Sequence, residues 1–399
     1  MAKTIIVLLL LIFISSSSYA LSEFTCIFTL INPSATNVAF GLNSGTANIW
    51  DRNPLGVWSN PAKLGYYKGL AYGYLHDKWF DFNWVDIYHD SSYLTFGWNG
   101  IGILLPLINN SNKFGTTMDY GEQIAVDHEG TIIDTFRSYE SCSQFAFGIN
   151  FLELTNKVFK YSSPIINLQR YSEISLGYSL DYIVSGLCPL IPELMDAEGK
   201  GESTSHNTGG IIRISPINLL GDILQNILHF DFSINDYLNL DLSYGINLIN
   251  IYRDGILYEN SNSKQPLPNG IRSGIAGKLL FINIKNLADE YPLLSDISKY
   301  LFSIYASYDE AKYGDNPSTC SKGIEYIFLD IFSLRRGKYY DYNGHIVGDS
   351  KGWGINLNYK DFICFQYNYV EFPGGELQAV QKKADMSFSV DILQLIKIL

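Results

Sequence analysis

The sequence has few charged residues, fewer basic than acidic ones, and no long apolar run after residue 20. After residue 20, no stretch approaches the roughly 20 consecutive apolar residues that a membrane-spanning helix needs. Charged residues make up 17% of the chain, against about 25% in average soluble domains. Lysine and arginine number 28, aspartate and glutamate 40, and the net charge of −12 offers no basic face to the phosphates of a nucleic acid. We therefore expect neither a helical membrane protein nor a nucleic-acid partner.

Signatures of catalysis and of metal binding are also missing. The six histidines are dispersed without the spacing of a zinc site, and neither a phosphate-binding glycine loop nor a nucleophile elbow is present. The pattern GWNGIG at 97–102 is a lone glycine cluster in an expected hairpin, and we interpret Asp119, Glu122 and Asp127 as an exposed acidic loop. The sequence predicts no enzymatic activity, no cofactor and no metal site.

Cysteine is too sparse to form a framework of disulfide bonds. The five cysteines, at positions 26, 142, 188, 320 and 364, are odd in number and form no C-x-x-C motif. They predict neither a disulfide framework nor a metal cluster. If a bridge forms, Cys188 with Cys320 is the expected pair, because both lie in loop-like sequence.

The N-terminus reads as an export signal. Residues 1–20 combine one early lysine, an apolar run from Ile5 to Ile14, a serine stretch and a small-x-small site ending at Ala20. The apolar run is too short to span a membrane. We expect a secretory signal peptide at 1–20 and a mature chain that begins near Leu21.

Aromatic residues and glycine are abundant, with 29 tyrosines, 23 phenylalanines and 34 glycines. The segments at 174–182 and 240–248 alternate strictly between large apolar residues and Ser, Gly, Asp or Asn, and the same period recurs within 354–360, 363–369 and 385–391. Successive strand side chains point to opposite faces, so each segment has one apolar and one polar face. The segments are about 9 to 11 residues long, as tilted transmembrane strands are. This pattern favours a transmembrane barrel, and a soluble β-sandwich is the alternative.

Two polar segments punctuate the pattern. We expect loops at 186–210 and at 258–270, where proline, glycine, serine and charged residues collect. Two stretches, 217–228 and 287–302, have apolar residues at roughly helical spacing and are either short rim helices or strands with irregular patterning.

Three stretches carry a resemblance to a known family. The first, NVAFGLNSGTANIWDRNPLGVWSNPAKLG at 37–65, is rich in small residues and ends in an asparagine-proline-alanine motif. The second and third are KGIEYIFLDIFSLRRGKYYDYNGH at 322–345 and GWGINLNYKDFICFQYNYVEF at 352–372. Together they resemble the PorV/PorQ group of outer-membrane proteins and the related FadL-like long-chain fatty-acid transporters. The chain departs from that group in lacking a terminal aromatic residue, for which Phe388 is the displaced equivalent.

The resemblance implies an all-β fold, a transmembrane antiparallel β-barrel of about 14 strands. It also implies a plug-like N-terminal segment at 21–65, followed by the barrel at 66–399. The simpler alternative for the motif is a tight turn that leads into the first strand, since Pro61 fixes its own backbone and that of Asn60. The residues that carry this resemblance are the small residues Ala39, Gly41, Gly45 and Ala47 and the motif Asn60, Pro61, Ala62, Lys63 and Leu64.

The second stretch places opposite charges on neighbouring strands. Glu325 would face Arg335 or Arg336 across an antiparallel pair that borders the lumen. Such pairs are usually structural, and a place in a substrate path is the alternative.

For function, the resemblance implies a PorV-type component of type IX protein secretion, with exported proteins that carry C-terminal signal domains, secretion-machine subunits and outer-membrane lipid as partners. The first alternative is a FadL-like passive transporter of hydrophobic small molecules through a lateral opening. The second is a secreted soluble β-sandwich that binds polysaccharide. The lumen separates the two transport interpretations: an apolar pocket favours the small molecule, and a wide polar lumen open at the side favours a protein partner.

Overall fold

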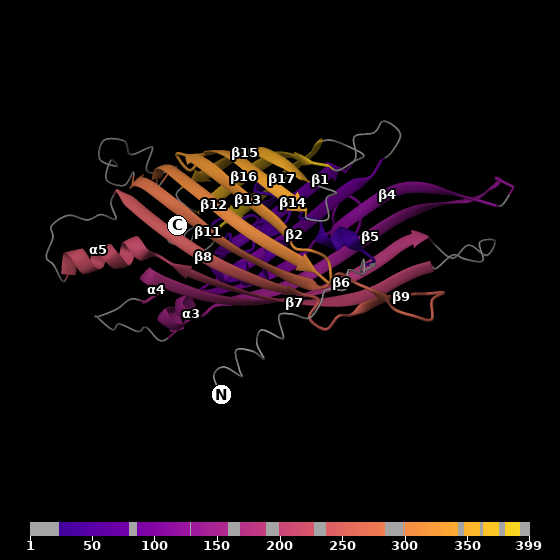
Figure 1. Ribbon diagram of the computed structural model, residues 1–399, viewed down its shortest axis with the longest axis horizontal. Coiled ribbons are helices and arrows are strands. Elements are labelled where there is room, and N and C mark those ends of the chain that lie inside the picture. Colours follow the sequence, from indigo (N-terminus) through magenta and orange to yellow (C-terminus); the bar gives the residue numbers. More distant parts are fainter. Residues whose placement is uncertain are drawn as a thin grey trace.

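The strands form a single antiparallel sheet that closes on itself. The computed structural model describes residues 24–79, 86–127, 129–158, 168–188, 199–226, 237–283, 298, 300–341, 347–359, 362–374 and 380–391. The sheet closes because β1 pairs with both β2 and β17. Within the described residues, the 17 strand segments make up 14 barrel strands. Three barrel strands consist of two segments each, since β3 continues as β4, β8 as β9, and β10 as β11. The chain is therefore a closed 14-strand β-barrel, as predicted (Figure 1).

The bounds of the elements follow the chain order. The wall consists of β1 (Gly69–Lys78), β2 (Tyr88–Trp98), β3 (Ile101–Pro106), β4 (Gly115–Val126), β5 (Ile132–Asn150), β6 (Ser172–Cys188), β7 (Gly199–Ile214), β8 (Leu238–Ile249), β9 (Gly255–Tyr258), β10 (Gln265–Pro266), β11 (Gly270–Asn283), β12 (Tyr300–Tyr313), β13 (Thr319–Phe328), β14 (Phe332–Asp341), β15 (Val347–Tyr359), β16 (Ile363–Pro373) and β17 (Val380–Val390). The helices are η1 (Ile27–Leu30), α2 (Ala35–Ala39), η2 (Pro54–Ser59), η3 (Pro61–Tyr66), α3 (Phe151–Val158), α4 (Leu168–Tyr171) and α5 (Pro216–Asn226). No helix in this part of the chain is long and apolar enough to cross a membrane.

The apolar face of the alternating strands points outward. In β6, Ile174 and Leu176 are 44% and 50% exposed on the outside, whereas Ser175 and Ser179 between and beyond them are fully buried on the inside. A soluble sandwich would turn these apolar faces inward between two sheets. The single closed sheet with an apolar exterior rules out the sandwich alternative and fits a barrel surrounded by lipid.

The two rims of the barrel differ. We call the rim where β1 begins at Gly69 the proximal end and the rim where β1 finishes at Lys78 the distal end. Helices α3, α4 and α5 lie at the proximal end, and β4 to β7 extend furthest at the distal end (Figure 1).

Residues 24–67 run inside the barrel, where Figure 1 shows them in indigo within the ring of strands. Their helices pack on many strands: η3 lies on β3, β5, β6 and β7, η2 on β1 and β2, and α2 on β14 to β17. A buried apolar cluster fills the space between η2, η3 and strands β1, β2, β3 and β5; it comprises Leu55, Val57, Leu64, Tyr67, Leu75, Tyr93, Leu104 and Ala146. The core of the molecule is thus the contact between this interior segment and the wall.

Some local predictions were wrong. The expected loop at 186–210 includes most of β7, which begins at Gly199, because a strand with polar residues on both faces shows no hydrophobic alternation. Asp119 and Glu122 belong to β4 and not to an acidic loop. The proposed partner of Cys188 is also wrong, since Cys320 is an unbridged buried thiol on β13.

Two other local predictions were confirmed, and two fall wholly or mostly on residues that the structure does not describe. Helix α5, Pro216–Asn226, covers the described part of the stretch at 217–228, so its helical interpretation is confirmed. The hairpin at 97–102 joins β2 to β3. The predicted leader at 1–20 and most of the stretch at 287–302 lie outside the described residues.

Candidate functional site

Each of the two Asn-Pro dipeptides of the interior segment opens a short helix. Pro54 begins η2 and Pro61 begins η3, at a position where proline costs no intrahelical hydrogen bond. The Oδ1 atom of Asn53 accepts a hydrogen bond from the Leu55 amide at 3.1 Å, and that of Asn60 accepts one from Ala62 at 3.0 Å. The motif at 60–64 therefore forms a capped 3-10 helix, and all five of its residues are buried inside the barrel.

The small residues before the motif let the chain turn and pack closely. Gly41 and Gly45 have φ angles of 119° and 98°, a region that L side chains rarely adopt. Ala39 is fully buried against Val370 of β16. The carbonyl of Ala47, also buried, accepts a hydrogen bond from the Ser243 hydroxyl of β8 at 2.7 Å. These four positions thus lie in the turns and contacts that fit the segment to the wall.

A row of wall glycines receives η3. They are register partners on successive strands: Gly97 of β2, Gly102 of β3, Gly148 of β5, Gly177 of β6 and Gly209 of β7. A Cβ atom on Gly177 would overlap the backbone of Pro61 and Ala62, and one on Gly102 would overlap the carbonyl of Leu64. Backbone cannot be displaced as the end of a side chain can. The row therefore forms a track on which the motif lies.

Two buried carboxylates of the wall bind backbone amides of the interior segment. Asp385 of β17 accepts a hydrogen bond from the Ala35 amide at 2.6 Å. Asp309 of β12 accepts one from the Thr46 amide at 2.9 Å and a longer one from Gly45 at 3.3 Å. The segment is thus held at two points on the β12 to β17 side of the barrel.

Arg272 of β11, the strand next to β12, holds the segment beside Asp309. Its guanidinium lies 3.6 Å from the ring centroid of Trp58, and its Nη1 donates to the Trp58 carbonyl at 3.3 Å. Its Nε donates to the Tyr313 hydroxyl at 2.7 Å, and the side chain is 2% exposed. The Ser175 hydroxyl of β6 donates to the Ala62 carbonyl at 2.6 Å. These contacts encircle the segment, since they come from strands all around the wall.

Lys63 and Asp51 bring two charges into the interior segment itself. The Lys63 ammonium is 1% exposed and donates to the Gly56 carbonyl at 3.1 Å. Burial lowers the pKa of this ammonium, and the nearby Asp51 carboxylate opposes that shift. The hydrogen bond from Lys63 to Gly56 links η3 to η2, since Gly56 belongs to η2.

The predicted lumen pair forms between Glu325 and Arg335. Arg335 Nε donates to Glu325 at 2.7 Å, and Nη1 donates to Asn368 at 2.9 Å. Arg336 lies on the other face of β14, where it pairs with Asp349 at 3.2 Å and is exposed. Both Glu325 and Arg335 line a polar cavity of about 90 Å³.

An apolar cavity lies between the interior segment and the wall at the distal end. Its volume is about 390 Å³, within the range of roughly 300 to 1,000 Å³ of small-molecule pockets. Most of its lining side chains are apolar or aromatic, and they are Leu30, Ile31, Val38, Leu42, Trp79, Tyr313, Tyr339, Phe372 and Pro373. One buried cation, Lys383, also borders it, with its ammonium donating to the Asn32 carbonyl at 2.5 Å. The cavity is suited to a mainly apolar ligand.

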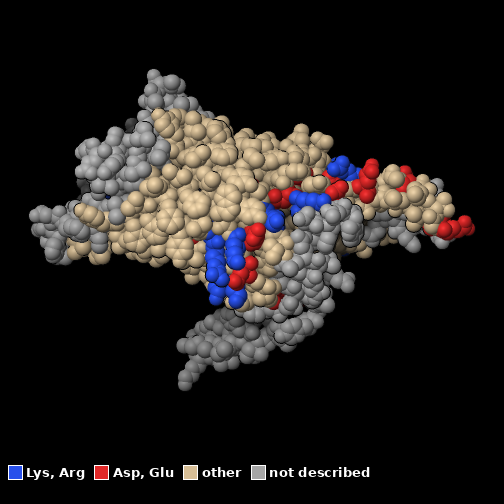
Figure 2. Space-filling view, turned by 90° about the horizontal axis from the view of Figure 1, so that it is seen from above, with Lys and Arg blue, Asp and Glu red and all other residues tan. Residues whose placement is uncertain are grey.

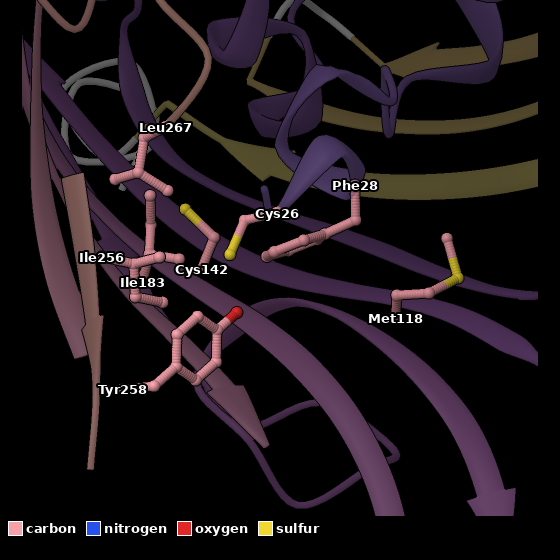
Figure 3. Close-up of a cluster of buried hydrophobic side chains, with 8 residues drawn as sticks. All are labelled: Cys26, Phe28, Met118, Cys142, Ile183, Ile256, Tyr258 and Leu267. Atoms are coloured by element: carbon pink, nitrogen blue, oxygen red, sulfur yellow. The ribbon is translucent and has the colours of Figure 1, made fainter. Parts of the chain in front are cut away.

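A second apolar region continues from this cavity toward β4 and β5. Figure 3 shows its eight buried side chains: Cys26, Phe28, Met118, Cys142, Ile183, Ile256, Tyr258 and Leu267. Ile31 and Trp79 pack against this cluster and also line the cavity. Cavity and cluster therefore form one continuous apolar surface.

The wall is interrupted where this surface meets it. β3 ends at Pro106 and β4 begins at Gly115, yet adjacent residues of β2 pair with both, so residues 107–114 leave the sheet and return to the same place. On the other side, residues 143–145 of β5 have no partner among the described pairings of β3 and β4. The hydrogen-bonded ladder that β3 and β4 form with β5 is thus broken next to the apolar cluster.

The proximal end differs, because its cavities are polar. The largest, of about 380 Å³, is bordered by charged side chains of both signs. They are Asp51, Arg52, Lys68, Glu153, Glu173, Arg213, Asp241 and Lys278. Among the described residues, no group of three or more His, Cys, Asp or Glu side chains is placed to hold a metal ion.

Sequence analysis missed the glycine track, the wall interruption and the apolar cavity. The track could be recognised only from the strand register, which pairs glycines distant in the chain. The interruption had a signal, the polar stretch at 109–113 between two apolar segments. The cavity had none, because its walls come from strand ends spread over the whole chain.

No protein-family model matches the chain, and no curated protein matches it. Several solved structures are similar in fold. The monoaromatic hydrocarbon channel CymD is 9% identical, with 92% of this chain and 99% of that chain covered and a TM-score of 0.36. The toluene transporter TodX of P. putida is 9% identical, with 84% of this chain and 92% of that chain covered and a TM-score of 0.36. A FadL homologue of Pseudomonas aeruginosa is 9% identical, with 89% of this chain and 98% of that chain covered and a TM-score of 0.33.

These structures are hydrocarbon channels and a FadL homologue, as in the FadL-like alternative. The comparisons do not support the PorV/PorQ interpretation. With every TM-score under 0.5, the likeness carries no argument about function. The closed 14-strand antiparallel barrel is shown by the strand pairings themselves.

Proposed function

We propose that this protein is an outer-membrane channel for the passive passage of a hydrophobic small molecule. The single observation that carries the proposal is the apolar cavity of about 390 Å³ at the distal end. A polar channel would not be lined there by leucine, isoleucine, tryptophan and phenylalanine. The predicted leader at 1–20 and the apolar exterior of the barrel support the location in the outer membrane.

The apolar surface supplies a route. A ligand in the cavity lies next to Ile31 and Trp79, which lead to the cluster around Met118 and Cys142. That cluster lies beside the broken ladder between β4 and β5. An apolar ligand can follow this path without entering the polar lumen, and the interrupted wall is the place where it would leave sideways.

The interior segment supports a small cargo. Residues 24–67 contact strands around the whole barrel, and the cavities left beside them include one of about 390 Å³ and one of about 380 Å³. A protein cargo or partner inside the lumen would need a wide polar space. No observation on the described residues favours the secretion function over the small-molecule channel.

Binding of a radiolabelled long-chain hydrocarbon to the purified protein tests the proposal, with excess unlabelled ligand to subtract partitioning into detergent. Leu42→Gln places an amide in the cavity. It should weaken saturable binding by about 1–2 kcal/mol, or roughly five- to thirtyfold. Leu219→Gln is the matched control, because Leu219 is exposed on α5 at the proximal end. Absence of saturable binding to the wild-type protein, or equal binding by both variants, would overturn the proposal.

A further inference from the structure

Basic side chains gather on one part of the outer wall, although the chain as a whole is acidic. Figure 2 shows the visible face, where lysine and arginine lie interleaved with aspartate and glutamate beside an uncharged stretch of wall. The strands here are β13 to β17, and the outward-facing cations, which we call the basic belt, are Lys322, Arg336, Lys338, Lys351 and Lys382. Only two acidic residues, Asp349 and Glu371, alternate with them in register. The belt thus carries a surplus of positive charge in a chain whose net charge is −12.

The register sets like charges directly opposite each other. Lys322 pairs with Lys338 across β13 and β14, and Arg336 pairs with Lys351 across β14 and β15. Cross-strand pairs of like charge destabilise a sheet. The protein's own carboxylates offset part of this repulsion: Asp349 lies opposite Lys338 and bonds Arg336 at 3.2 Å, and Glu371 lies between Lys351 and Lys382. Five cations against two carboxylates leave a surplus of positive charge, to which an external anion can bind.

The belt lies next to an aromatic band at a level typical of lipid headgroups. The Trp353 ring contacts the rings of Tyr367 and Tyr369, at centroid distances of 5.6 Å and 5.9 Å, on the proximal side of the belt. Lys351 precedes Trp353 by two residues on β15, which places it about 7 Å closer to the distal end. Aromatic side chains mark the membrane interface in barrels. The cations are therefore placed where phosphate groups of lipids would lie.

Tyr340 keeps the cations in place without neutralising them. The Lys338 ammonium lies 4.9 Å and the Lys322 ammonium 5.4 Å from the centroid of its ring. A cation over an aromatic face keeps its charge, although the Lys338 ammonium donates one hydrogen bond to Tyr340. The positive charge of both ammonium groups thus remains available to an anion outside the protein.

We propose that the basic belt binds the phosphate groups of an anionic membrane lipid in the distal leaflet. The inference depends on the barrel lying in a membrane and is independent of the cargo. Each cation near an anionic surface adds to the attraction, and phosphate accepts hydrogen bonds from several cations at once. A specific lipid would then line β13 to β17 at the rim near the apolar cavity.

Native mass spectrometry of the detergent-solubilised full chain tests this inference, with phosphatidylglycerol as the anionic probe and phosphatidylcholine as the zwitterionic reference. The double variant Lys322→Gln/Lys338→Gln should lose roughly thirtyfold in affinity for phosphatidylglycerol. Arg253→Gln/Lys264→Gln removes the same charge from exposed positions outside the belt and should leave the affinity unchanged. Heat-modifiable mobility on a denaturing gel verifies that each variant is folded. Arg336→Gln/Lys351→Gln repeats the test on the second like-charge pair, should the first variant fail to fold.

Three results would overturn the inference. One is equal affinity of the wild-type protein for both lipids. Another is equal loss in the belt variant and in the control variant, which would indicate a general charge effect. The third is displacement of the bound lipid by millimolar inorganic phosphate, which would indicate a site for a soluble anion.

Discussion

Gly177→Ala should loosen the interior segment from the wall. Gly177 faces inward on β6, where an added Cβ would overlap the backbone of Pro61 and Ala62. That backbone is fixed on the same strand, since Ser175 donates to the Ala62 carbonyl at 2.6 Å. One methyl group must therefore displace η3 from the track.

The expected cost follows from two contributions. Overpacking of a tight contact costs about 1–3 kcal/mol, and loss of the Ser175 hydrogen bond adds about 0.5–1.5 kcal/mol. We expect the free energy that favours the docked over the displaced segment to fall by about 2–4 kcal/mol. Since each 1.4 kcal/mol is tenfold, the population with a displaced segment should rise roughly thirty- to thousandfold. Gly210→Ala is the control, because its Cβ would make only ordinary contacts, at 3.5 Å from Leu176.

Limited trypsin digestion with mass spectrometry reads this out. Lys63 is 1% exposed, so cleavage after it requires the segment to leave the track. We expect much faster cleavage at Lys63 in Gly177→Ala than in the wild-type protein or Gly210→Ala. Equal resistance of the three proteins would refute the close packing of η3 on the glycine track.

Further predictions concern the charged anchors. Arg335→Gln should lower the free energy of unfolding by about 3 kcal/mol, because it leaves Glu325 buried without its partner, whereas the exposed Arg336→Gln should change it by less than about 1 kcal/mol in urea titration. Arg272→Met should shift the tryptophan emission spectrum, since the guanidinium lies on the Trp58 ring; an unchanged spectrum would contradict that contact. Asp385→Ala should speed proteolysis of residues 24–67 by removing the acceptor of the Ala35 amide, and unaltered proteolysis would exclude it as an anchor.

The sequence predicted the membrane-spanning strands but not their polar extensions. Segments such as 174–182 alternate because one face meets lipid and the other meets polar neighbours, so their pattern predicts strands directly. The same rule fails in β7, where Glu202 and Ser205 lie beyond the apolar band and both faces are polar. Patterns tied to lipid contact thus predict the membrane-spanning part of each strand and miss its extension.

The candidate site depends on register more than on composition. Gly148, Gly177 and Gly209 meet only once three strands are aligned, and no local pattern distinguishes them from turn glycines. The motif Asn60-Pro61 was visible because proline and an asparagine cap act within a few residues. The apolar cavity combines Leu42 with Phe372, which are distant in the chain and close only in the closed barrel.

The most direct test of the proposed channel is a structure of the protein with a brominated hydrocarbon, whose anomalous signal marks its position. The account predicts a bromine peak in the distal cavity, between Leu42 and Phe372. A cavity without ligand, together with bromine found only on the outer apolar wall, would contradict it.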